Sequence, residues 1–319
     1  MIHFVGAGPG APDLITVRGQ KLLEEADVII YAGSLVNPEL LQTAGEGCQI
    51  YNSAYMTLEE VLKVMEDAEK EGLTTVRLHT GDPSIYGAVR EQMEELEKRG
   101  IPYDVTPGVS SFCGAAAALG MEYTLPGVSQ SVILTRMEGR TKVPEKEAIE
   151  SFAAHQATMV LFLSSAMIGE LAEKLVEGGY APQTPAAIVY KATWPEEKAF
   201  VCTIDTLEKT AADNDIDRTA LIIVGEAVRY NGAQHETQSG DGRSLQSGVM
   251  RSRLYDADFE TGYRSAKSKE RRKTERRDNC IEEDTRRYLP RWRLPCLLAL
   301  CSALRWEAYP SRPEKSRRS

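Results

Sequence analysis

The sequence predicts two α/β domains with mostly parallel or mixed sheets and a cleft between them. Short apolar runs alternate with helical stretches along residues 1–230, which is typical of βαβ units. A second such series starts after Pro126-Gly127, and 319 residues are enough for two domains of ordinary size. We therefore expect domains at about 1–120 and 125–230, joined by a short hinge.

In the first domain, strands are predicted at 2–5, 28–31, 75–79 and 103–106. A capping box, Thr57 with Glu60, opens a helix that ends near Gly72. Further helices are expected at 85–99, closed by Gly100, and at 110–119.

In the second domain, the same signals predict five strands and three helices. The strands are at 131–135, 158–163, 186–190, 199–204 and 220–224, and the helices at 145–154, 166–177 and 206–212. Residues 231–250 are rich in Gly, Ser and Gln and predict a flexible loop, within a terminal segment 231–264. Residues 265–319 read as a basic, poorly ordered tail without a catalytic role.

The composition excludes several classes of protein. Residues 1–265 carry a net charge of −17 and residues 266–319 one of +8, so the body does not favour nucleic acid as a partner. No apolar run approaches the ~20 residues that span a bilayer, and no basic-then-apolar leader opens the chain. Six cysteines without a C-x-x-C pair and four histidines without i, i+4 spacing predict no metal site. We expect a cytoplasmic protein that binds no membrane.

The most informative stretch is the glycine-rich turn after the first apolar run, where Gly6, Gly8 and Gly10 alternate with other residues. So many glycines indicate backbone that turns sharply and lies so close to a neighbouring group that a Cβ would clash, which makes a ligand site the first hypothesis. Gly6, Gly8 and Ala11 also fit the loose dinucleotide fingerprint. That alternative requires a helix that opens at the glycines. Pro9 and Pro12 instead predict extended chain until about Thr16, and Asp27 precedes the next strand where a ribose-binding acid should follow it.

Small and polar residues follow four of the predicted strands. They are Thr80-Gly81-Asp82-Pro83, Pro107-Gly108-Val109-Ser110-Ser111, Ser164-Ser165 and Lys191-Ala192-Thr193-Trp194. Ligands of open α/β sheets bind beyond the carboxyl ends of strands. Each stretch alone fits a turn or a helix cap, but four from two domains predict a shared site in the cleft.

The string Val5–Gly19, with its Asp-Leu-Ile-Thr-Val-Arg-Gly continuation, resembles the opening motif of the S-adenosylmethionine-dependent tetrapyrrole methylases. Ala11 departs from the acid that many members carry. Further stretches, His79–Ala88, Val132–Thr141, Leu161–Ser165 and Val189–Pro195, resemble the branch that methylates precorrin-4, or its cobalt form, at C11 in cobalamin biosynthesis. The resemblance covers about residues 1–264. It implies a methyltransferase that is a homodimer and takes an anionic tetrapyrrole as substrate.

The resemblance also implies that S-adenosylmethionine binds between the two domains. Its expected contacts are Pro9, Thr80, Gly81, Asp82, Ile85, Ser110, Ser111, Leu163, Ser164, Ala192 and Ala220. A carboxylate and loop carbonyls suit the ammonium and ribose groups of this cofactor, and apolar side chains suit its adenine. Asp82 is in addition a weak candidate for a proton-transfer role.

A substrate with many carboxylates needs clustered cations in so acidic a body. The candidates are Arg18, Arg136, Arg140, Lys142 and Lys191. Methyl transfer from a sulfonium needs alignment and exclusion of water, so we expect no catalytic triad. Three alternatives remain open. The first is another methylase of the same fold, which acts on uroporphyrinogen III, acts at another precorrin position or forms diphthine. The second is an NAD-dependent oxidoreductase, and the third is a binding module without turnover.

Overall fold

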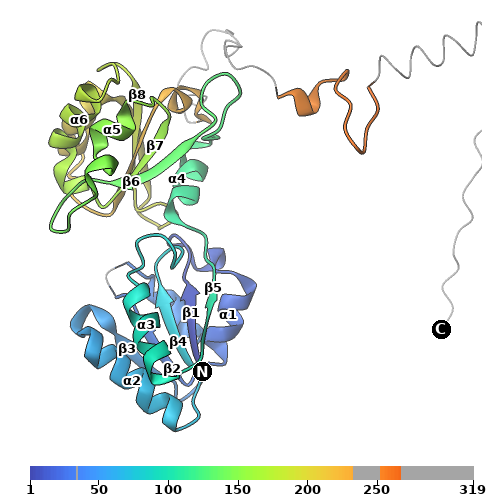
Figure 1. Ribbon diagram of the computed structural model, residues 1–319, viewed down its shortest axis with the longest axis vertical. Helices are drawn as coiled ribbons and strands as arrows, with labels where there is room; N and C mark the ends of the chain where they lie inside the picture. The colour runs from blue at the N-terminus through green and yellow to red at the C-terminus, as the bar shows by residue number, and fades with distance from the viewer. Residues whose placement is uncertain (34, 233–251, 267–319) are drawn as a thin grey trace, which may run out of the picture. The chain divides into compact units, whose positions relative to one another are not determined.

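The computed structural model describes residues 1–33, 35–232 and 252–266. The chain divides into two units, residues 1–250 and 251–319. The first contains two five-stranded sheets (Figure 1). The described part of the second holds one 3₁₀ turn, Arg253–Tyr255, beside which the Arg264 guanidinium donates to the carbonyls of Leu254 and Asp256.

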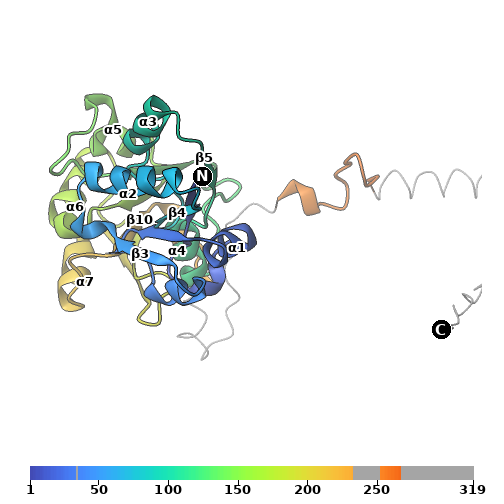
Figure 2. The same cartoon turned by 90° about the horizontal axis from the view of Figure 1, so that it is seen from below.

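The first sheet is parallel throughout, in the order β3-β2-β4-β1-β5. Its strands are β1 (Ile2–Gly6), β2 (Val28–Tyr31), β3 (Gln49–Asn52), β4 (Thr75–His79) and β5 (Tyr103–Thr106). Helices α2 (Leu58–Lys70) and α3 (Arg90–Arg99) cover one face, and α1 (Val17–Glu24) lies on the other (Figures 1 and 2). Each face buries its own apolar layer, so the sheet is enclosed on both sides.

The second sheet is mixed, in the order β6-β7-β10-β8-β9. Its strands are β6 (Val132–Arg136), β7 (Thr158–Phe162), β8 (Pro185–Tyr190), β9 (Lys198–Thr203) and β10 (Ala220–Val224). The pair β6 and β7 is parallel, whereas β10 is antiparallel to both β7 and β8. Helices α5 (Ile149–Ala153), α6 (Ile168–Glu177) and α7 (Leu207–Asp213) pack on one face.

Helix α4 (Ser111–Leu119) packs on the other face of this second sheet. Its Ala115 and Leu119 are fully buried against side chains of β7, β8 and β10. The sequence placed this helix with the first domain, and the domain bounds at 120 and 125 stay a prediction. The chain therefore crosses from one sheet to the other before α4, directly after β5.

Two local expectations were wrong, and one strand was not expected. Helix α3 begins at Arg90 and not at Ile85, because Tyr86 (φ 55°) and Ala88 (φ 49°) have left-handed backbone that no α-helix contains. Strand β3 was not predicted, because Gln49–Asn52 is a short edge strand without a continuous apolar run. Pro12–Leu14 forms a 3₁₀ turn where extended chain was expected.

The predicted flexible loop falls largely on residues 233–251 and the predicted tail on residues 267–319, which lie outside the described residues. Among the described residues, no helix is both long and apolar enough to cross a membrane.

Candidate active site

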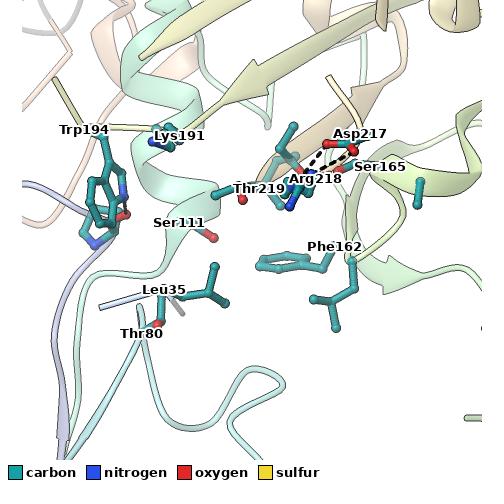
Figure 3. Close-up of a pocket in the computed structure, with 16 residues that line it drawn as sticks. Leu35, Thr80, Ser111, Phe162, Ser165, Lys191, Trp194, Asp217, Arg218 and Thr219 are labelled. Carbon is teal, nitrogen blue, oxygen red and sulfur yellow. Dashed lines mark hydrogen bonds and ion pairs between the residues drawn. The ribbon is translucent and has the colours of Figure 1, made fainter. Parts of the chain in front are cut away.

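A pocket of about 330 Å³ lies among strand ends of both sheets (Figure 3). Its walls are mainly apolar, with a few hydroxyl and charged groups among them. The lining residues are Pro9, Leu35, Thr80, Ser111, Phe162, Leu163, Ser165, Ala166, Lys191, Ala192, Trp194, Asp217, Arg218, Thr219, Ala220 and Leu221.

Strand direction explains why these residues meet. Thr80 follows β4 and Ser111 follows β5, while Leu163 follows β7 and Lys191 follows β8. The carboxyl ends of parallel strands share one edge of a sheet. Strand β10 runs the opposite way between β7 and β8, so the residues that precede it reach the same edge.

Beneath the pocket, the loops after β1, β4 and β5 are packed backbone against backbone. A Cβ on Gly6 would lie 2.5 Å from Gly108 Cα, and one on Gly108 would lie 2.0 Å from the Gly81 carbonyl oxygen. Gly8 and Gly81 exchange backbone hydrogen bonds of 3.3 and 2.8 Å. The glycines are therefore needed for close approach, and the loop does not open a helix, because α1 starts only at Val17 after an N-cap at Thr16.

Of the eight non-glycine residues with left-handed backbone in the described part of the chain, four lie at the pocket or next to it. Leu163, Lys191 and Thr219 line it with φ of 51°, 45° and 55°, and Thr193 beside them has φ of 68°. Left-handed backbone is costly for β-branched residues in particular. Such strain is typical of sites where the fold holds residues in position for a ligand.

Six of the eleven residues predicted to bind the cofactor line this pocket. They are Pro9, Thr80, Ser111, Leu163, Ala192 and Ala220. The hydroxyl oxygen of Thr80 is buried and has no hydrogen-bond partner within the described part of the chain. An unpaired buried hydroxyl at a pocket wall fits a polar ligand that would complete it.

The other five, Gly81, Asp82, Ile85, Ser110 and Ser164, do not line the pocket. Gly81 belongs to the backbone floor, Ile85 packs against the core beneath α4, and Ser110 is the N-cap position of α4. The Ser164 hydroxyl accepts from Met137 N (2.9 Å) and donates to Phe162 O (2.7 Å), so it joins the ends of β6 and β7.

Both carboxylate oxygens of Asp82 are occupied within the protein. Oδ1 accepts from Ser84 N at 2.8 Å and from the Ser84 hydroxyl, and Oδ2 accepts from Gly108 N at 2.9 Å. Partial burial raises the pKa of Asp82, but these hydrogen bonds together outweigh it and hold the pKa below its usual value. Asp82 thus ties the loop after β4 to the loop after β5.

Two titratable residues of strand β4 itself, Arg77 and His79, are buried. The Arg77 Nε donates to Gln92 Oε1 (3.0 Å), and Gln92 Nε2 donates to the carbonyl of Ala88 (2.8 Å). Burial lowers the pKa of Arg77 to about 10. Burial, aided by the charge of Arg77, lowers the pKa of His79 to about 3, so its imidazole is neutral at pH 7.

Of the five predicted substrate-binding cations, Lys191 alone lines the pocket. Its ammonium lies 3.2 Å from Glu196 Oε1. The Arg136 guanidinium donates to the carbonyls of Met137, Thr141 and Lys142, at 3.0 to 3.2 Å, and so braces the loop that follows β6. Arg140 and Lys142 are exposed on that loop, and Arg18 is exposed on α1.

Sequence reasoning missed seven of the lining residues. They are Leu35, Phe162, Ala166, Asp217, Arg218, Thr219 and Leu221. Asp217 and Arg218 form an ion pair at the pocket wall (2.9 Å; Figure 3). The stretch 217–219 gave no signal because it precedes a strand, and only the antiparallel direction of β10 brings it to this edge. Ser165 and Trp194 also line the pocket, and both belong to the stretches after strands that predicted a shared site.

Among the described residues, no group of three or more His, Cys, Asp or Glu side chains could hold a metal ion. The cysteines in this part of the chain, Cys48, Cys113 and Cys202, are free.

Residues 1–208 match the family model of the tetrapyrrole (corrin/porphyrin) methylases. The cobalt-precorrin-4 C(11)-methyltransferase of Methanocaldococcus jannaschii is 49% identical over 268 residues, which are 84% of this chain and 97% of that protein. The precorrin-4 C(11)-methyltransferase of Pseudomonas aeruginosa is 44% identical over 232 residues, 72% of this chain and 92% of that protein.

Solved structures agree with this. A cobalt precorrin-4 methyltransferase, described as a cobalamin biosynthetic enzyme, superimposes with a TM-score of 0.70 at 45% identity, covering 71% of this chain and 95% of that one. The uroporphyrin-III C-methyltransferase of Thermus thermophilus, complexed with S-adenyl homocysteine, has a TM-score of 0.59 at 27% identity, over 72% and 93% of the two chains. The dinucleotide-binding alternative is therefore wrong, and the chain belongs to the tetrapyrrole methylase family.

Proposed function

We propose that this protein transfers a methyl group from S-adenosylmethionine to C11 of precorrin-4 or cobalt-precorrin-4, a step of cobalamin biosynthesis. The observation that carries the proposal is a pocket at strand ends of two sheets with an unpaired hydroxyl in its wall, in a chain 41–49% identical to enzymes named for that reaction.

The pocket is the proposed cofactor site. Its volume of about 330 Å³ lies at the lower end of the ~300–1,000 Å³ typical of small-molecule sites. Leu163, Ala192 and Ala220 supply apolar walls for an adenine ring, and the hydroxyls of Thr80 and Ser111 supply polar contacts for ribose or amino-acid groups. Gly81, Asp82, Ile85, Ser110 and Ser164 would act one layer further out, by fixing the loops.

The proposed tetrapyrrole contacts are the cations Arg18, Arg136, Arg140, Lys142 and Lys191. Because the body has a net charge of −17, an anionic macrocycle would bind only where such cations gather. Leu35, an apolar side chain of the pocket lining that stays exposed, is suited to the flat face of a macrocycle.

When bound, S-adenosylmethionine supplies a methyl group already activated by a sulfonium. The protein's own part is then to orient the two reactants and to exclude water, which is worth up to roughly 7–11 kcal/mol. The strained loops that line the pocket are suited to that task, because they fix the walls before a ligand arrives. No residue need act as a nucleophile. The chain is also proposed to act as a cytoplasmic homodimer.

The test is a transfer assay with methyl-labelled S-adenosylmethionine and three acceptors: precorrin-4, its cobalt form and uroporphyrinogen III. We expect a new methyl at C11, located by NMR. Transfer to uroporphyrinogen III alone would assign the chain to another reaction of the family, and cofactor binding without transfer to any acceptor would overturn the proposed substrate.

A pocket-filling variant tests the site itself. Ala220→Leu places three more carbon atoms in the pocket wall and should abolish binding of S-adenosylhomocysteine. Ala199→Leu, on the exposed side of β9, is the matched control and should bind normally. Normal binding by Ala220→Leu would move the cofactor elsewhere.

A further inference from the structure

We propose that Trp194 is a positioning residue of the cofactor pocket, which clamps the glycine-rich loop of the first sheet onto the second sheet. The inference rests on the proposed cofactor site. Trp194 (Figure 3) and Pro9 both line the pocket. They are far apart in the chain and follow strands of different sheets. The wall that they share exists only while the two segments are held together.

Two hydrogen bonds join the segments. The indole Nε1 of Trp194 donates to the carbonyl of Pro9 at 3.2 Å. Next to it, the backbone N–H of Ala11 donates to the Thr193 hydroxyl at 2.9 Å. Both bonds link parts of the chain more than 180 residues apart. The loop after β1 is thus held at two successive points by consecutive residues of the segment after β8.

Gly10 shows how closely the ring approaches. A Cβ at this position would lie 2.2 Å from Trp194 Cδ1 and 2.4 Å from Nε1, too close for any side chain. The carbonyl of Gly10 accepts a buried hydrogen bond from Asn37 Nδ2 at 3.0 Å. Because Asn37 holds the loop from within the first sheet's domain, Gly10 cannot easily retreat from the ring.

The Trp194 side of the contact is equally constrained. The ammonium of Lys191 lies 5.6 Å from the centre of the indole ring and is itself paired with Glu196. Lys191 and Thr193 have left-handed backbone, and the backbone N–H of Thr193 donates to the Glu197 carboxylate. Residues 191–197 therefore present the indole to Pro9 in a fixed orientation.

The test measures the affinity for S-adenosylhomocysteine by titration calorimetry, with melting temperatures recorded for every variant. Gly10→Ala is the central variant, because the backbone at Gly10 is not left-handed and the three atoms nearest to the new Cβ all belong to the Trp194 indole. We expect affinity to fall about tenfold or more, as for an overpacked contact. Gly262→Ala, whose Cβ would meet nothing within 4 Å, is the matched control and should bind like the wild type.

Trp194 variants complete the experiment. Trp194→Phe keeps an aromatic ring but loses the N–H, and should bind about three- to tenfold more weakly. In the Trp194→Ala background the ring is gone, so adding Gly10→Ala should cost nothing further. Additive losses from the two substitutions, or wild-type affinity in Trp194→Phe, would overturn the clamp.

The pocket-filling variant separates this inference from the proposal beneath it. If Ala220→Leu binds S-adenosylhomocysteine normally, the cofactor site is misplaced. If Ala220→Leu fails to bind while Gly10→Ala binds normally, the site stands and the clamp alone is wrong.

Discussion

Thr80 and Thr75 lie just past and at the start of β4, and both have buried hydroxyl oxygens without a partner among the described residues. They differ in one respect, since Thr80 lines the pocket and Thr75 does not. An unsatisfied buried hydroxyl costs free energy in the folded protein unless a ligand completes it. Substituting the two threonines in turn therefore distinguishes an effect on ligand binding from an effect on folding.

We predict that Thr80→Val weakens S-adenosylhomocysteine binding about fivefold or more, because the hydroxyl is lost from the pocket wall. Its free energy of unfolding should stay equal to that of the wild type or rise slightly. Thr75→Val should likewise have a free energy of unfolding equal to or slightly above that of the wild type, but its affinity for S-adenosylhomocysteine should be unchanged. Calorimetric titration and denaturant unfolding measure the two quantities, and equal affinity in both variants would exclude Thr80 from the site.

Both carboxylate oxygens of Asp82 accept hydrogen bonds from Ser84 and Gly108, which indicates a structural role for this residue. The folded pKa lies below the unfolded value of 3.8. Its stabilising contribution is therefore fully present above pH 3.8 and is lost as the pH falls through the lower, folded pKa.

We predict that Asp82→Asn lowers the free energy of unfolding at pH 7 by about 1 kcal/mol, because an amide cannot accept all of these hydrogen bonds. The difference from the wild type should shrink below pH 3.8, as measured by thermal melts across pH. Affinity for the cofactor product should fall modestly as the loop loosens. Normal affinity together with abolished turnover would instead make Asp82 catalytic.

At the scale of elements, patterns within one strand were predictable and relations between strands were not. The bounds of β2 and β10 follow from continuous apolar runs, and those of β4 and β5 from short stretches with β-branched or aromatic residues between turn residues. The antiparallel direction of β10 could not be predicted, because an apolar run does not indicate whether the strand pairs with its neighbours in parallel or antiparallel. Asp217, Arg218 and Thr219 were therefore missed as pocket residues, while Thr80 and Ser111, which follow strands of a parallel sheet, could be predicted to reach this edge.

The loop after β6 is the element on which Arg136, Arg140 and Lys142 lie. Arg136 braces it through three backbone carbonyls, whereas Arg140 is simply exposed. We predict that Arg136→Ala raises the KM for the tetrapyrrole about tenfold with cofactor affinity intact, since both a cation and the loop's support are lost. Arg140→Ala should raise this KM less.

Steady-state kinetics of Arg136→Lys distinguish the two contributions, because lysine keeps the charge but cannot reproduce the guanidinium fork. Recovery of the KM in this variant would indicate direct contact with substrate carboxylates, and no recovery would indicate support of the loop. Wild-type kinetics in Arg136→Ala would remove the residue from the site altogether.

At the scale of the whole molecule, residues from the ends of both sheets line one pocket, and the pH dependence of unfolding reports on the core of the first sheet. His79 lies in the core beside Phe4, with ring centres 6.0 Å apart. Its pKa falls from 6.5 to about 3 on folding, through burial first and the charge of Arg77 second. The unfolded chain therefore binds a proton at this residue that the folded protein does not, wherever the pH lies between these values.

The free energy of unfolding therefore decreases as the pH falls below 6.5, because the unfolded chain is stabilised by the proton that it binds at His79. We predict that the titration of His79 alone lowers the free energy of unfolding of the wild type by about 2 kcal/mol between pH 7 and pH 5. His79→Leu removes the titrating group, so its free energy of unfolding should change less over the same interval when both proteins are unfolded by denaturant. Because all other histidines are common to the two proteins, parallel pH curves would show that the His79 imidazole does protonate in the folded core, and that acid destabilises the molecule elsewhere.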